Sequence, residues 1–190
     1  MAVIRTAQIE DALAIAHVHV DTWRATYGGI IPDEHLANLS YERCQASWIE
    51  HLSQPEVERV FVVEEPGGPI VAFASGGLIK EALGEWDGEL YVLYVLKAFQ
   101  GMGYGKRLVT HVAQDLARRD FRSMVIWVMK DNPARRFYEK LGGRLIGEEE
   151  ITIGGKALLK VAYLWPDLAV LIHSEVGKGT LGSGWQSELT

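Results

Sequence analysis

Cysteine is almost absent from this chain, since Cys44 is the only one among 190 residues. A single cysteine cannot form an internal disulfide, so we expect a reducing, cytoplasmic setting. Residues 1–8 have neither the basic start nor the apolar run of a signal peptide, and no apolar stretch is long enough to span a bilayer. We therefore expect a protein without a membrane partner.

Basic residues are also scarce, with 19 Lys and Arg against 25 Asp and Glu and a formal net charge of -6. This balance disfavours proteins that neutralise the phosphates of a nucleic acid. Metal-ligand spacing is missing too, because His17 and His19 lie two apart on a predicted helix and point to different sides. Cys44 has no motif of a nucleophilic enzyme beside it and is interpreted as a buried structural thiol. We expect no metal and no covalent enzyme intermediate.

Apolar residues are plentiful at 48%, which is enough for the core of one ordinary domain. We assign that single domain to residues 1–172. From residue 173 onward the chain turns to Gly, Ser, Thr and Lys without periodicity, so 173–190 is predicted to be a flexible tail.

The hydrophobic pattern predicts a mixed α/β fold. Ile9, Leu13, Ala16 and Val20 follow helical spacing behind a capping Thr6. Further helices are expected from Pro32 and at 41–52, 105–118 and 132–141, and strands at 2–5, 59–64, 70–79, 89–96, 123–129, 145–153 and 156–164. Turn signals at 66–69 and 154–155 indicate two antiparallel hairpins, whereas the strand, helix, strand order of 89–129 indicates one parallel crossover.

A glycine-rich turn, Gln100–Gly105, connects a buried strand directly to a helix. The backbone N–H groups of such a turn and the positive end of the helix dipole together form an anion site, suited to phosphate or pyrophosphate. Lys106 and Arg107 add positive charge next to it. In a chain with negative net charge, this local basic patch indicates a phosphate-bearing ligand.

Three interpretations of this turn compete. A P-loop needs a glycine where Gln100 stands and a Ser or Thr where Arg107 stands, so it fails. A dinucleotide fingerprint fails because the glycines fall at 101, 103 and 105. A tight turn without a ligand remains the ordinary interpretation of an isolated glycine cluster.

Two further motifs flank this turn: Leu93-Tyr94-Val95 at the end of the preceding strand, and residues 132–143, Asn-Pro-Ala-Arg-Arg-Phe-Tyr-Glu-Lys-Leu-Gly-Gly, beyond the next strand. Together with Gln100-x-x-Gly103-x-Gly105, these motifs occur in the order and spacing of a known family. Over roughly residues 2–166, the chain resembles the GCN5-related N-acetyltransferase superfamily. The resemblance implies a mostly antiparallel sheet of about seven strands, with helices on both faces and strands 4 and 5 splayed apart.

The resemblance also implies a site for acetyl-CoA. The main chain of Leu93 and Val95 would bond the pantetheine arm as an added strand does. The pyrophosphate would lie on the turn residues Gln100, Gly101, Met102, Gly103, Tyr104, Gly105 and Lys106. Asn132 would either cap the helix that follows it or bond the same arm.

Two residues are candidates for catalysis. Tyr138 matches the family position that lies close to the cofactor sulfur, where a phenol can donate a proton to the departing thiolate; the alternative is that it only packs. Glu89 precedes Val95 by the interval of the family's catalytic glutamate and would be the general base, although Glu85, Asp87 and Glu89 together could be a solvated acidic loop.

The acceptor side in such folds lies between the first helices and the last hairpin. Trp23 and Tyr27 are its leading candidates, together with Glu89, whose negative charge would attract a cationic amine. Arg24, Ile30 and Trp48 are further candidates, although aromatic residues at these spacings more often belong to the core.

The activity implied is direct transfer of an acetyl group from acetyl-CoA to a primary amine of a small molecule or peptide, through a ternary complex. The alternatives are an acyl-CoA-binding regulatory module without turnover and a protein or peptide acetyltransferase. The sequence leaves open the acceptor amine, whether Glu89 or water takes the proton, and a homodimer.

Overall fold

A seven-stranded sheet forms the centre of the computed structural model, which describes residues 1–80 and 84–173. The strands are β1 (Val3–Thr6), β2 (Glu58–Glu64), β3 (Ile70–Leu78), β4 (Gly88–Val95), β5 (Met124–Met129), β6 (Arg144–Ile153) and β7 (Lys156–Trp165). Their order is β1-β2-β3-β4-β5-β7-β6, and all neighbours are antiparallel except β4 and β5. This confirms the predicted mixed, mostly antiparallel sheet.

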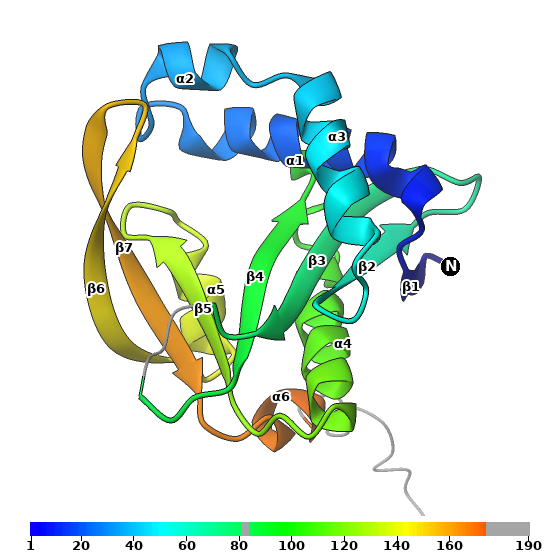
Figure 1. Ribbon diagram of the computed structural model, residues 1–190, viewed down its shortest axis with the longest axis vertical. Helices are drawn as coiled ribbons and strands as arrows, with labels where there is room; N and C mark the ends of the chain where they lie inside the picture. Colours follow the sequence, from blue (N-terminus) through cyan, green and yellow to red (C-terminus); the bar gives the residue numbers. More distant parts are fainter. Residues whose placement is uncertain (81–83, 174–190) are drawn as a thin grey trace, which may run out of the picture.

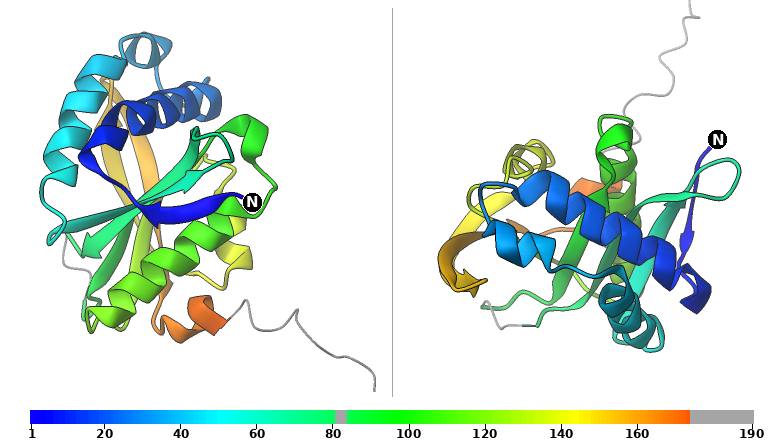
Figure 2. Two further views of the ribbon diagram at one scale, coloured as in Figure 1. Left: turned by 90° about the vertical axis from the view of Figure 1, so that its right-hand side faces the viewer. Right: turned by 90° about the horizontal axis from the view of Figure 1, so that it is seen from above.

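Helices cover both faces of the sheet, with α1 and α3 on one side and α4 and α6 on the other (Figure 2). The helices are α1 (Ala12–Tyr27), α2 (Asp33–Ala37), α3 (Tyr41–Leu52), α4 (Tyr104–Arg118), α5 (Arg135–Lys140) and α6 (Ala169–His173). Two 3₁₀ turns, η1 (Ile9–Asp11) and η2 (Lys97–Phe99), precede α1 and α4. Among residues 1–80 and 84–173, no helix is both long and apolar enough to cross a membrane.

Helix α6 was not predicted. Of the tail expected at 173–190, only His173 is described, and it ends α6; residues 174–190 lie outside the described residues.

Strand β4 supplies side chains to two separate cores because successive residues of a strand face opposite sides. Leu93 and Val95 pack in the core beneath α4, whereas Val92 and Tyr94 pack in the core beneath α1 and α3. Helix α4 buries Leu108, Val112 and Leu116 in the first of these cores, as its periodicity predicts.

The predicted inner face of α1 is partly wrong. Ala16 and Val20 are buried, but Leu13 is 48% exposed and Ile9 lies in η1, before the helix. Ala12, Ile15 and Val18 are buried instead, because α1 packs against the sheet on one side and against α3 on another. Thr6 belongs to β1 rather than to a helix cap, and Gln8 with Asp11 forms a capping box at η1.

Strands β4 and β5 touch only at their first residues and then diverge (Figure 1). The only pairs between them are Gly88 with Met124 and Glu89 with Val125. At Gly88 the strands are so close that a Cβ atom would lie 2.5 Å from the carbonyl oxygen of Ser123. The register with β3 also shifts at Tyr91, which forms a bulge just beyond this contact. The V-shaped gap between the two strands is the splay that the family resemblance implies.

Candidate active site

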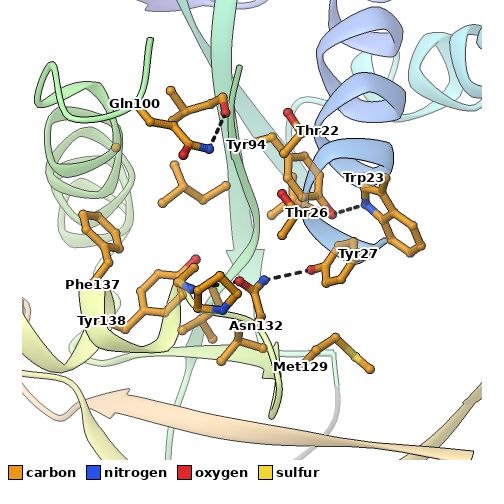
Figure 3. Close-up of a pocket in the computed structure, with 18 of the residues that line it drawn as sticks. Thr22, Trp23, Thr26, Tyr27, Tyr94, Gln100, Met129, Asn132, Phe137 and Tyr138 are labelled. Atoms are coloured by element: carbon orange, nitrogen blue, oxygen red, sulfur yellow. Dashed lines mark hydrogen bonds between the residues drawn. The ribbon is translucent and has the colours of Figure 1, made fainter. Parts of the chain in front are cut away.

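The gap between β4 and β5 opens into a cavity of about 960 Å³, here called the main cavity. Figure 3 shows α1 on one side of it and α5 on the other, with Tyr94 and Asn132 between them. Thirteen of the fourteen predicted site residues line this cavity: Trp23, Tyr27, Glu89, Leu93, Val95, Gln100, Gly101, Gly103, Tyr104, Gly105, Lys106, Asn132 and Tyr138. The exception is Met102, whose side chain points outward and is 57% exposed.

The main-chain groups of Leu93 and Val95 point into the main cavity. In an antiparallel pair, alternate residues of one strand bond the neighbouring strand. The Leu96 N–H donates to Val71 O at 3.0 Å, so Leu96 bonds β3. Tyr94, two residues earlier, belongs to the same set of residues that bond β3. Leu93 and Val95 therefore direct their N–H and C=O groups away from β3. The side-chain amide of Gln100 donates to Val95 O at 3.1 Å and fixes the end of this strand (Figure 3).

The glycine turn takes the left-handed backbone that its sequence predicts. Gly101 has φ 80° and Gly103 has φ 84°, a region that residues with a Cβ atom rarely adopt. Gly103 immediately precedes α4, so the first N–H groups of that helix open toward the cavity. Arg107 does not join this site, because its guanidinium donates to Ala2 O at 3.3 Å.

Replacing Gly103 with Ala is expected to strain this turn by roughly 1–2 kcal/mol and to raise the KM for acetyl-CoA about fivefold, through misaligned N–H groups. Gly155 is the matched control, since it has φ 77° and open space around it but lies in the β6–β7 turn. Gly155→Ala should lower the free energy of unfolding similarly and leave that KM unchanged. Urea denaturation and steady-state kinetics measure both quantities, and equal KM values for the two variants would contradict the assignment.

Asn132 connects the two sides of the main cavity. Its Oδ1 accepts a hydrogen bond from the Ala134 N–H at 2.8 Å, and its Nδ2 donates to the Tyr27 hydroxyl at 3.1 Å. Tyr27 lies 105 residues away, at the end of α1, and both side chains are buried. Asn132 is therefore not the predicted cap of α5, whose N-cap is Ala134, but it bonds the N–H of that residue and also anchors α1.

The Asn132→Ala variant should lose about 1–3 kcal/mol of unfolding free energy, because it leaves the buried Tyr27 hydroxyl without its donor. A double-mutant cycle with Tyr27→Phe isolates this bond. The double variant is expected to lose less than the sum of the two single variants. Strict additivity in urea denaturation would show that the bond does not couple the two segments.

Among the tyrosines that line the main cavity, Tyr27, Tyr94 and Tyr138 interact with one another. Burial raises the pKa of all three, and the neighbouring Tyr27 adds to the increase at Tyr94 and Tyr138. Each is therefore neutral at physiological pH and able to donate. The Tyr94 hydroxyl accepts from the Trp23 indole N–H at 2.8 Å, whereas the Tyr138 hydroxyl bonds no residue in the described part of the chain.

Glu89 lies in strand β4, at the point where β4 leaves β5, and is 8% exposed. Its Oε2 accepts a hydrogen bond from the Lys80 N–H at 2.9 Å. The other two members of the acidic loop lie elsewhere: Glu85 is exposed, and the Asp87 carboxylate bonds the N–H groups of Arg122 and Ser123.

The remaining candidates for the acceptor side lie outside the main cavity. Arg24 donates to the carbonyl oxygens of Leu36 and Leu39, and Ile30 packs against the hydrophobic cluster that contains Leu36. Trp48 is buried and its indole N–H donates to His19 Nδ1 at 3.1 Å.

His17 and His19 do face different sides, since His17 stacks on Tyr41 and His19 on Tyr94. Burial lowers the pKa of His19 to about 4, so this ring is neutral. Cys44 is only half-buried and lies 3.5 Å from His19 Nδ1, with a pKa raised by burial.

Several lining residues were not predicted, among them Thr22, Thr26, Tyr94 and Phe137 (Figure 3). The Thr22 hydroxyl is buried and has no hydrogen-bond partner in the part of the chain that the structure describes. Tyr94 had a signal, because it stands between Leu93 and Val95 in the matched motif. Thr22 had none beyond its place one residue before Trp23.

The chain is similar to N-acetyltransferases in both sequence and structure. A family model described as FR47-like protein matches residues 70–152. The uncharacterized N-acetyltransferase YuaI of Bacillus subtilis is 37% identical over 171 residues, which is 90% of this chain and 96% of YuaI. The 5-NmdU N-acetyltransferase of Pseudomonas phage PaMx11 is 33% identical over 136 residues, 67% of this chain and 91% of the phage protein.

Solved structures show the same fold at lower identity. The PaiA N-acetyltransferase of Thermoplasma acidophilum, in complex with coenzyme A, has a TM-score of 0.67 at 18% identity, over 84% of this chain and 98% of that one. The putative acetyltransferase yncA of Salmonella typhimurium, with its cofactor acetyl-CoA, has a TM-score of 0.66 at 23% identity, over 88% of this chain and 94% of that one. The chain belongs to the GCN5-related N-acetyltransferase superfamily, whose members are acetyl-CoA-dependent acyltransferases.

Proposed function

We propose that this chain transfers the acetyl group of acetyl-CoA directly to a primary amine, with both substrates bound at once. One observation carries the proposal. A single cavity is lined by the glycine turn, by Leu93 and Val95 of β4, and by Glu89 and Tyr138. Direct transfer needs both substrates within reach of each other, and a shared cavity provides this.

Acetyl-CoA fits the groups present. The N–H groups of the left-handed turn at Gly101 and Gly103 would hold the pyrophosphate, with Lys106 contributing positive charge. The main chain of Leu93 and Val95 would bond the amides of the pantetheine arm as a neighbouring strand would. The thioester would then lie deeper in the gap between β4 and β5, toward Glu89 and Tyr138.

The chemistry requires a neutral amine and a stabilised leaving group. The amine nitrogen attacks the thioester carbonyl carbon, a C–N bond forms, the C–S bond breaks, and the sulfur leaves with the bonding electron pair. Glu89 accepts the proton that the amine loses, and the Tyr138 hydroxyl donates to the thiolate as charge develops on it. The first role suits a buried carboxylate and the second suits a phenol that remains protonated.

Thiol release measures this activity directly. The purified chain, acetyl-CoA and a panel of small primary amines and lysine-containing peptides should release free coenzyme A at rates that identify the acceptor class. Calorimetric titration with acetyl-CoA gives the affinity independently of turnover. Binding without release for any amine or peptide would favour a regulatory module, and an absence of binding would refute the proposal.

A further inference from the structure

A second cavity, of about 660 Å³, lies between α1, α3 and the sheet and is here called the side cavity. Its wall includes Trp48, His51 and Glu58, none of which lines the main cavity. The two cavities share four residues, Lys80, Glu89, Tyr91 and Val92. A molecule that extends from Glu89 therefore has a second space beside the reaction centre, separate from the glycine turn.

Two of the residues that line the side cavity, Glu58 and Glu89, are the ends of a row across three strands. Glu58 of β2 pairs with Gly77 of β3, and Gly77 pairs with Glu89 of β4. Residues that pair directly across a sheet face the same side of it. Glu58 and Glu89 are therefore on one side, two strand spacings or about 10 Å apart. Gly77 has no side chain, and the Tyr91 ring takes the space above it. A Cβ atom at Gly77 would lie 2.8 Å from the Tyr91 hydroxyl oxygen.

The chain's own ammonium group occupies this row. The Lys80 Nζ lies 3.7 Å from the centroid of the Tyr91 ring and 4.0 Å from Oε2 of Glu58. The carboxylate is buried, and its other neighbour, His51 Nδ1, is 3.0 Å away. An aromatic face beside a desolvated carboxylate is a favourable environment for an ammonium ion. The Lys80 side chain is 55% exposed, so it can leave this position without disturbing the core.

We propose that the acceptor is a linear diamine, whose distal ammonium replaces the Lys80 ammonium between the Tyr91 ring and Glu58 while its other amine reaches Glu89. This inference rests on the proposed acetyl transfer and names the class of its acceptor. The spacing of the row favours two nitrogens separated by several methylene groups. A monoamine of equal length has no group for the second position and would lose that interaction.

Matched amines test the proposal on the intact chain. The kcat/KM ratio of diaminohexane to hexylamine, and of diaminobutane to butylamine, should exceed about tenfold for at least one pair. Glu58→Gln and Tyr91→Leu should each reduce this ratio toward one. The control Glu50→Gln changes an exposed carboxylate on α3 and should preserve the ratio. Equal rates for diamines and monoamines would overturn the inference and leave acetyl transfer standing.

Binding gives a readout that does not depend on turnover. Calorimetry of diaminohexane with the chain saturated in coenzyme A should show affinity that Glu58→Gln abolishes. Lys80→Met should tighten it severalfold, because that variant removes the competing ammonium. Unchanged or weaker binding in Lys80→Met would overturn the inference even if Glu58→Gln fails to fold. If the chain binds the diamine tightly but releases no thiol with any amine, the proposed activity is refuted and the diamine site is retained.

Discussion

Replacing Tyr138 with Phe is expected to lower kcat about a hundredfold and to change the affinity for acetyl-CoA less than about twofold. The ring of Tyr138 is 4% exposed and would still fill its place against Phe137 and Trp165. The hydroxyl bonds no described residue, so its removal leaves no partner unsatisfied. What is lost is a donor toward the sulfur, which matters as negative charge develops during C–S cleavage. Single-turnover kinetics and calorimetry separate the two quantities.

Tyr163 provides the matched control for this variant. Its ring is also buried, 6.3 Å from the ring of Tyr138, but it lies outside the main cavity. Its hydroxyl donates to Glu139 Oε1 and accepts from Arg135 Nε. Tyr163→Phe should cost about 1 kcal/mol of stability and leave kcat unchanged. If both variants have the wild-type kcat, Tyr138 only packs, which is the alternative that its sequence context leaves open.

Features encoded by contiguous residues were predictable from the sequence. The turn at Gly101 and Gly103 follows from glycine's access to positive φ, and the inner face of α4 follows from helical spacing. The hairpins likewise follow from local turn signals. The splay of β4 from β5 came from the family resemblance, and its physical cause, the bulge at Tyr91 and the close approach at Gly88, became visible only in the structure.

Features that join distant segments were not predictable in this way. The Asn132–Tyr27 bond and the Lys80–Tyr91–Glu58 contact depend on how the strands and helices pack, which no local pattern encodes. The face of α1 was misassigned for a related reason. This helix contacts the sheet and α3 at once, so several of its apolar positions can be buried and spacing alone does not select among them.

Converting Glu89 to Gln is expected to reduce kcat/KM about a hundredfold at neutral pH and to change the shape of the pH profile. The carboxylate is buried where β4 leaves β5, and its oxygen accepts the Lys80 N–H, a bond that the amide oxygen of Gln can retain. The variant therefore removes the base and can keep the bond to the Lys80 N–H. Without that base, the rate depends on the fraction of amine that is already neutral, and this fraction increases with pH toward the pKa of the amine.

The profile of the variant should accordingly keep rising through the alkaline range, while that of the wild type levels off at lower pH. Glu85→Gln is the control, because Glu85 belongs to the same acidic stretch but is exposed. It should reproduce the wild-type profile. A Glu89→Gln profile that coincides with that of the wild type would show that water takes the proton and that Glu89 is not the general base.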